Sequence, residues 1–208
     1  TIEVESEEVT GSLFSEGETE SHSFTFQLQN KYIITRIRDG LLAIHQQWAH
    51  ERVLYEEFLH NITVKEAVSQ QLLFPMEVEF TTMEMELLSE IREQLEYMGF
   101  AFEVFSDEKM VINGLPVNVK QGDVKDILEH LLDDLQNEVP ETTFSQNDLL
   151  AKSMARSLAI KTGTPLGKEQ QEHLVNSLFA CKEPNCSPNN KTTFIKINTS
   201  DLDKKFNS

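Results

Sequence analysis

The stretch FTFQLQNKYIITRIRDGLLAIHQQWAHERVLYEE, residues 24–57, changes its apolar period part of the way along. Up to about residue 44 the apolar side chains alternate as they do in half-buried strands, and Arg38-Asp39-Gly40 is a turn signal. From residue 46 onward, helical spacing relates Ala49, Val53, Leu54 and Phe58. The stretch therefore predicts an antiparallel meander of strands over residues 24–44, followed by a helix over about residues 46–61.

The remaining sequence predicts strands and helices in mixed order. Residues 70–80 are apolar with a proline inside, a helix is expected over 82–98 with Gly99 at its end, and strands over 100–105 and 109–113 precede a helix over 122–137. The C-terminal part predicts helices over 146–161 and 166–180, a strand over 193–197 and a short helix over 200–206 with Ser200 as N-cap.

These elements predict an α+β fold with two lobes. Residues 22–71 and 139–208 would form one lobe, with an antiparallel or mixed sheet and helices. Residues 72–138 read βαββα and would form a second lobe, inserted into the first.

Charge and composition exclude several classes of protein. The chain has 208 residues and a net charge of −17, so by itself it should bind DNA or RNA poorly. Residues 1–21 are rich in Glu and Ser and are expected to be a disordered acidic linker, and the first residue is Thr, as in a piece of a longer protein.

An apolar run of about 18 residues is lacking, which predicts no membrane span or membrane partner. Two cysteines favour a reducing, cytoplasmic compartment.

The densest polar stretch, HQQWAHERVLYE at residues 45–56, lies at the predicted strand-to-helix junction. A helix with a polar first turn is one explanation. The stretch also resembles the C-terminal domain of the MutL family of DNA mismatch-repair proteins, where the motif reads Asp-Gln-His-Ala-x-x-Glu-x-x-x-x-Glu and commonly includes Ala-His-Glu-Arg. Gln46, Glu51 and Glu56 match this motif, whereas His45, Gln47 and Trp48 differ from it.

A second stretch, SQQLLFP at residues 69–75, resembles the Gln-x-Leu-Leu-x-Pro motif with which that family docks on the replication sliding clamp. The matching residues are Gln70, Leu72, Leu73 and Pro75, and Phe74 completes the apolar run. An extended segment of this kind offers one amide to a polar pocket and apolar side chains to a groove. The alternative is a strand that packs Leu72, Leu73 and Phe74 into the core.

A third stretch, ARSLAIKTGTP at residues 155–165, resembles a family helix that ends in basic-x-Gly, so the resemblance covers about residues 22–206. It implies a dimerising domain and, in many members, a metal-dependent endonuclease that nicks DNA. The family builds that site from His, Cys and Glu side chains, which suit zinc or manganese. The family's ATPase belongs to its N-terminal domain.

The chain departs from the family at most of these ligand positions. The residues that align with the family's His, Cys, Cys and His are Gln47, Arg156, Ser187 and Asn189. An amide is a poor zinc ligand, and the charge of Arg156 would repel a metal ion. The donors available for an altered site are His45, His50, Glu51, Cys181 and Cys186, and the candidates among them are His45, Glu51 and Cys186. We therefore expect no cofactor in this chain, with zinc or manganese as the alternative.

The sequence thus predicts the C-terminal dimerisation domain of a MutL-like protein, cytoplasmic and without endonuclease activity, in which Gln46, Glu51 and Glu56 remain of the catalytic motif. The expected partners are a second copy, the sliding clamp and other mismatch-repair proteins, with DNA reached only through the full-length protein. One alternative is a metal-dependent DNA-nicking endonuclease with divergent ligands. Another, from the pattern alone, is an acidic interaction domain unrelated to repair.

Overall fold

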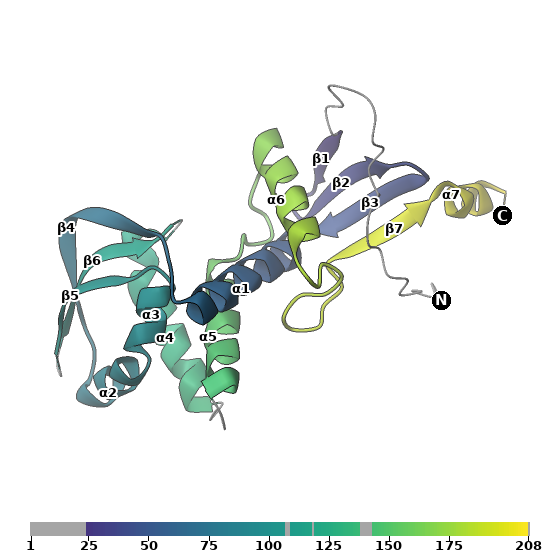
Figure 1. Cartoon of the computed structure of the whole chain (residues 1–208). Coiled ribbons are helices and arrows are strands. Elements are labelled where there is room, and N and C mark those ends of the chain that lie inside the picture. Colours follow the sequence, from purple (N-terminus) through teal and green to yellow (C-terminus); the bar gives the residue numbers. More distant parts are fainter. Residues whose placement is uncertain (1–23, 107–108, 118, 138–142, 208) are drawn as a thin grey trace.

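The computed structural model describes residues 24–106, 109–117, 119–137 and 143–207. The expected acidic linker, residues 1–21, lies outside these described residues. The described chain is an α+β fold with two antiparallel sheets, which confirms the predicted fold class (Figure 1).

The first sheet has four strands in the order β1-β2-β3-β7. The predicted meander is confirmed as β1 (Thr25–Leu28), β2 (Tyr32–Ile37) and β3 (Gly40–His45), and β7 (Phe194–Asn198) pairs with β3. Gln29 and Asn30 both have positive φ between β1 and β2, as a tight hairpin requires. One face of this sheet packs Ile33, Leu42 and Ile44 against helix α6 (Lys168–Ala180).

Helix α1 (Gln46–Val64) connects the two halves of the molecule (Figure 1). Its 19 residues extend the predicted helix to Lys65, which has the left-handed conformation typical of a helix end. Near its start, Ala49 joins the core beneath the first sheet. Farther along, Phe58 and Ile62 enter the second core. The helix is roughly 28 Å long, and so it spans both cores.

The second sheet has the order β4-β6-β5, with strands β4 (Ser69–Glu79), β5 (Ala101–Phe105) and β6 (Lys109–Pro116). Its helices are α2 (Thr82–Glu90), α3 (Arg92–Tyr97) and α4 (Val124–Asn137), the last preceded by the short helix η1 (Gln121–Asp123). Helix α5 (Thr143–Leu158) lies along α1 and adds Leu150 and Met154 to the same core.

Two sequence predictions about helices are wrong in detail. The helix expected over residues 82–98 divides into α2 and α3 at Ile91, which has φ −108° and ψ 11°. Apolar spacing continues across the break, and Ile91 is itself buried, so periodicity does not reveal it. The last helix, α7 (Thr199–Phe206), begins after Asn198, so Asn198 and not Ser200 is its N-cap. The N–H of Asn198 donates to Asp201 Oδ2 over 3.3 Å, which supports this earlier start.

Among the helices of the described residues, none has the length and apolar character needed to cross a membrane.

Candidate functional site

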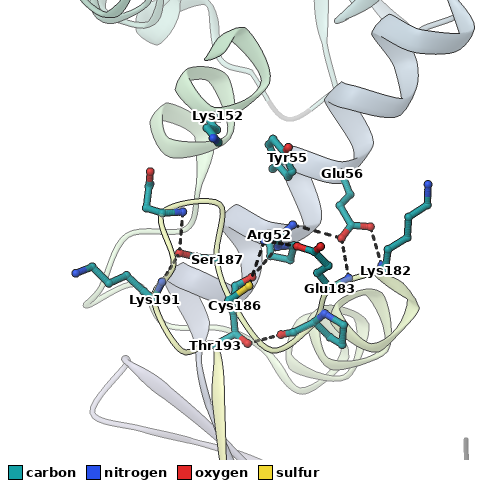
Figure 2. Close-up of polar contacts among 12 residues, drawn as sticks. Arg52, Tyr55, Glu56, Lys152, Lys182, Glu183, Cys186, Ser187, Lys191 and Thr193 are labelled. Atoms are coloured by element: carbon teal, nitrogen blue, oxygen red, sulfur yellow. Dashed lines mark hydrogen bonds and ion pairs between the residues drawn. The ribbon is translucent and has the colours of Figure 1, made fainter. Parts of the chain in front are cut away.

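The residues that align with the family's metal ligands come partly together at the start of α1. Asn189, in the loop between α6 and β7, donates from Nδ2 to Glu51 Oε1 over 2.6 Å. The hydroxyl of Ser187 is buried and accepts the N–H groups of Asn189 and Lys191, at 3.3 and 3.2 Å (Figure 2). These bonds close the loop into a tight turn, from which the side-chain amide of Asn189 points at Glu51. A direct hydrogen bond therefore joins two of the aligned positions.

Glu51 is a buried carboxyl whose pKa is set by opposing effects. Burial raises the pKa, because a charged carboxylate loses hydration there. The hydrogen bond from Asn189 acts in the opposite direction, as do the positive charges of Arg156, Lys161 and Arg52. The net shift is upward. Glu51 thus faces an amide and cations, which are groups that bind a carboxylate and not a metal ion.

The two glutamines at the start of α1 tie this helix to the turn that follows α5. Gln46 is fully buried, and its Nε2 donates to the carbonyl oxygens of Lys161 and Thr164, each over 3.2 Å. Gln47 Oε1 accepts the backbone N–H and the hydroxyl of Thr162, at 3.3 and 3.0 Å. Both side chains therefore position the helix terminus. Gln47 fills with an amide the place where the family motif has histidine.

The remaining candidate ligands also bond to protein groups. His45 caps α1, because its Nδ1 accepts the N–H of Trp48 over 3.4 Å and its ring stacks on the indole with centroids 3.8 Å apart. Burial and the nearby charge of Lys31 lower the pKa of His45. Cys186 Sγ lies 3.5 Å from Arg52 Nη2. Within the described residues, no three His, Cys, Asp or Glu side chains gather closely enough to hold a metal ion.

Arg156, at the position that aligns with the family's cysteine, lies in the last turn of α5 and forms an ion pair with Asp134 of α4. Its guanidinium is half exposed and still close enough to favour the charged form of Glu51. An arginine, an amide, a hydroxyl and a second amide thus stand at the aligned positions. This donor set does not fit zinc or manganese.

In the sequence Arg52 stands out only as the last residue of the Ala-His-Glu-Arg stretch, with no role assigned to it, yet it is the centre of the polar network around the loop (Figure 2). Its guanidinium is buried, and Nε donates to the carbonyl oxygen of Cys186 over 2.6 Å. The other two nitrogens lie 3.6 and 3.5 Å from the carboxylates of Glu56 and Glu183. Glu56 also accepts the N–H groups of Lys182 and Glu183 at the end of α6. The available signal was the Arg52–Glu56 spacing, since i and i+4 share a helix face.

The segment that resembles the clamp motif lies in edge strand β4 and leaves the sheet register. β4 pairs with β6 up to Gln71 and again from Met76, with an irregularity between them. Pro75 has no backbone N–H to donate to a β-ladder. A proline is therefore tolerated where the ladder is interrupted. Leu73 and Phe74 are 93% and 80% exposed, so the core-strand alternative is wrong for both. Leu72 packs partly on the second core.

A hollow of about 680 Å³ lies beside this segment. Its other wall comes from the end of β6 and the chain before η1, with Leu115, Val117, Val119 and Lys120. Apolar side chains thus stand at a surface hollow, in an edge strand whose local ladder is interrupted. That is an arrangement suited to binding a partner.

Comparison with known proteins identifies the family of the chain. The family model "MutL C terminal dimerisation domain" matches residues 25–166. The chain is 55% identical over 203 residues to the DNA mismatch repair protein MutL of Flavobacterium psychrophilum, covering 97% of this chain and 33% of that protein. It is 51% identical over 205 residues to MutL of Christiangramia forsetii, covering 99% of the chain and 33% of that protein, and 39% identical over 181 residues to MutL of Chlorobium chlorochromatii, covering 87% and 28%.

The chain spans about a third of the length of these curated relatives. The family match covers both the meander and the helix with Ala49–Arg52, and the identities extend over nearly the whole chain. The chain belongs to the MutL C-terminal dimerisation domain family of DNA mismatch-repair proteins.

Proposed function

We propose that this chain is the dimerisation domain of a MutL protein and pairs with a second copy through the free face of its first sheet. The register places Phe26 beside Ile34, then Ala43, then Ile195, on the face opposite to the one that packs on α6. Phe26 and Ile195 remain 43% and 49% exposed, and Phe24 and Leu28 lie on the same face. This apolar row is the observation that supports the proposal most strongly.

Two such faces would pack together as sheets do in a sandwich, about 10 Å apart. Two-fold symmetric pairs are the commonest oligomers. Light scattering of the chain at micromolar concentration tests the proposal, and a monomer mass would contradict it.

The proposal includes a division of labour between two lobes. Residues 22–71 and 139–208 would form the dimerisation lobe, and residues 72–138 the inserted external lobe. The separate sheets of the described residues support this division, although α1 and α5 of the first lobe also contribute side chains to the core of the second. The 71/72 boundary falls where the register of β4 with β6 shifts.

We further propose that the domain does not cleave DNA. The support is the donor set: Gln47 and Asn189 are committed to hydrogen bonds with Thr162 and Glu51, and Arg156 brings positive charge to the place. We expect the purified chain not to nick supercoiled DNA when manganese or zinc is added. Agarose-gel conversion of supercoiled to open-circular plasmid measures this directly.

The assay should be repeated with the full-length protein and the sliding clamp, because other domains could supply DNA affinity. Metal-dependent nicking that is abolished by Glu51→Ala or by His45→Ala would contradict the proposal. It would instead support an endonuclease whose site is rebuilt from different ligands.

Residues 70–75 are proposed to bind the sliding clamp. The support is the exposed pair Leu73 and Phe74 beside the hollow of about 680 Å³, with Gln70 at the start of the segment. Replacing Leu73 and Phe74 together with Ala should weaken clamp binding at least tenfold, because a fully buried side chain of this size contributes about 1.5–3 kcal/mol. Biolayer interferometry on immobilised clamp measures the change.

Leu72 is unsuitable for this test, since it packs partly on the core and its loss would disturb the fold. The double variant must keep the melting temperature of the parent chain. Unchanged clamp affinity in such a variant would refute the assignment of the segment.

The activities of the whole protein belong to the same proposal. The relatives are named as DNA mismatch repair proteins, and this supports a role in repair with an ATP-binding N-terminal domain, contact with other repair proteins and with DNA through the full-length protein, and a cytoplasmic location.

A further inference from the structure

A second hollow of about 340 Å³ lies where α1 ends and β4 begins. Leu54, Phe58, Met98 and Pro116 are the buried residues that line it. Val64 and Val68 also line it and are 46% and 74% exposed. We call this hollow the hinge groove, because it lies at the junction between α1, the connection to β4 and the end of β6.

The hinge groove adjoins the hollow beside the clamp segment, because the two share a lining residue. Val117, at the end of β6, lines both hollows and is 52% exposed. Val68 of the groove stands two residues before Gln70 of the segment. Exposed apolar side chains therefore line both hollows: Leu73 and Phe74 one of them, Val64 and Val68 the other, and Val117 both. Exposed apolar side chains gathered at adjoining hollows indicate an interaction site, whereas single scattered ones do not.

We propose that the sliding clamp covers the hinge groove as well as the segment, so that Val64, Val68 and Val117 form a second contact region. This inference rests on the proposed clamp binding by residues 70–75. A specific interface between folded proteins buries about 1,200–2,000 Å² in total, and a short segment supplies only part of that area. A folded partner seated on Leu73 and Phe74 would also reach the groove, because Val117 lines both hollows.

Charged side chains around the two hollows favour one orientation of the bound clamp. Glu57 and Glu66 line the hinge groove, and Lys120 lines the hollow beside the segment. The clamp surface over the groove should therefore be neutral or basic, and the surface opposite Lys120 neutral or acidic. Complementary charges of this kind set the orientation of a partner more than its affinity.

The test substitutes a residue that lines the groove alone. Val68→Asp is measured against Val104→Asp, which makes the same change of side chain and charge at an exposed valine in β5 that lines neither hollow. Clamp affinity of the whole chain is measured for both variants and for the Leu73→Ala/Phe74→Ala double variant. Val68→Asp is expected to weaken binding about tenfold, and Val104→Asp less than twofold.

The outcomes separate the two proposals. If the double variant loses affinity while Val68→Asp behaves like Val104→Asp, the second contact region is refuted and clamp binding by the segment stands. If only Val68→Asp loses affinity, joint binding by the segment and the groove is refuted, because Leu73 and Phe74 then contribute nothing. If all three variants bind like the parent chain, both proposals fail. Val64→Asp repeats the test at the other side of the groove.

Discussion

Arg52→Met is expected to lower the free energy of unfolding by about 3 kcal/mol, the lower end of the range for removing one partner of a buried charge pair. Methionine keeps most of the apolar stem of arginine, so the loss reports the guanidinium. Without it, the Cys186 carbonyl loses a 2.6 Å hydrogen bond and Glu56 loses its ion-pair partner. The loop between α6 and β7 would then be held to α1 mainly through Glu56 and Glu51.

The matched control is Arg38→Met, the same change at an exposed arginine in the turn between β2 and β3. A surface change of this kind normally alters stability by less than about 0.5 kcal/mol. Urea unfolding followed by circular dichroism measures both variants. Equal losses in the two would show that the buried network contributes no more than an exposed side chain.

Arg52 also shows which contacts can be predicted from the sequence and which cannot. The meander and α1 follow from periodicity, since each strand and helix must bury one apolar face and the spacing shows which face. The i, i+4 relation of Arg52 and Glu56 is likewise visible in the sequence. The contacts of Arg52 with Cys186 and Glu183 are not, because they depend on where a loop more than a hundred residues away folds back. Local patterns carry no information about such long-range contacts.

In the candidate site, too, the residue types can be predicted from the sequence and their contacts cannot. The replacement of the family's ligands by Gln47, Arg156 and Asn189 is a statement about residue types, and the sequence contains it. The bond from Asn189 to Glu51 and the commitment of Gln47 to Thr162 are consequences of packing. The break at Ile91 is likewise not visible in the sequence, because apolar side chains keep helical spacing on both sides of it.

The largest effect on assembly is expected from a charge placed on the free face of the first sheet. Phe26 is paired with Ile34 in the register, and the row continues to Ala43 and Ile195. In a two-fold dimer every substitution occurs twice, so Phe26→Glu removes two aromatic side chains and brings two carboxylates into one interface. Phe26 is 43% exposed in the single chain, so at about 1.5–3 kcal/mol for a fully buried phenylalanine the two rings together contribute roughly 1–3 kcal/mol per dimer. Burying two carboxylates in the interface raises the total loss to at least about 3 kcal/mol.

A loss of that size corresponds to an increase of at least about 100-fold in the dimer dissociation constant. The control is Val104→Glu, which places the same charge on an exposed apolar position of the second sheet. Sedimentation velocity over a range of protein concentrations measures both constants, and the melting temperature shows whether each variant is folded. Ile195→Glu should reproduce the effect of Phe26→Glu, since it stands in the same row. If Phe26→Glu and Ile195→Glu dimerise as tightly as the parent chain, the partner binds elsewhere, and the free face of the sheet must be covered in another way.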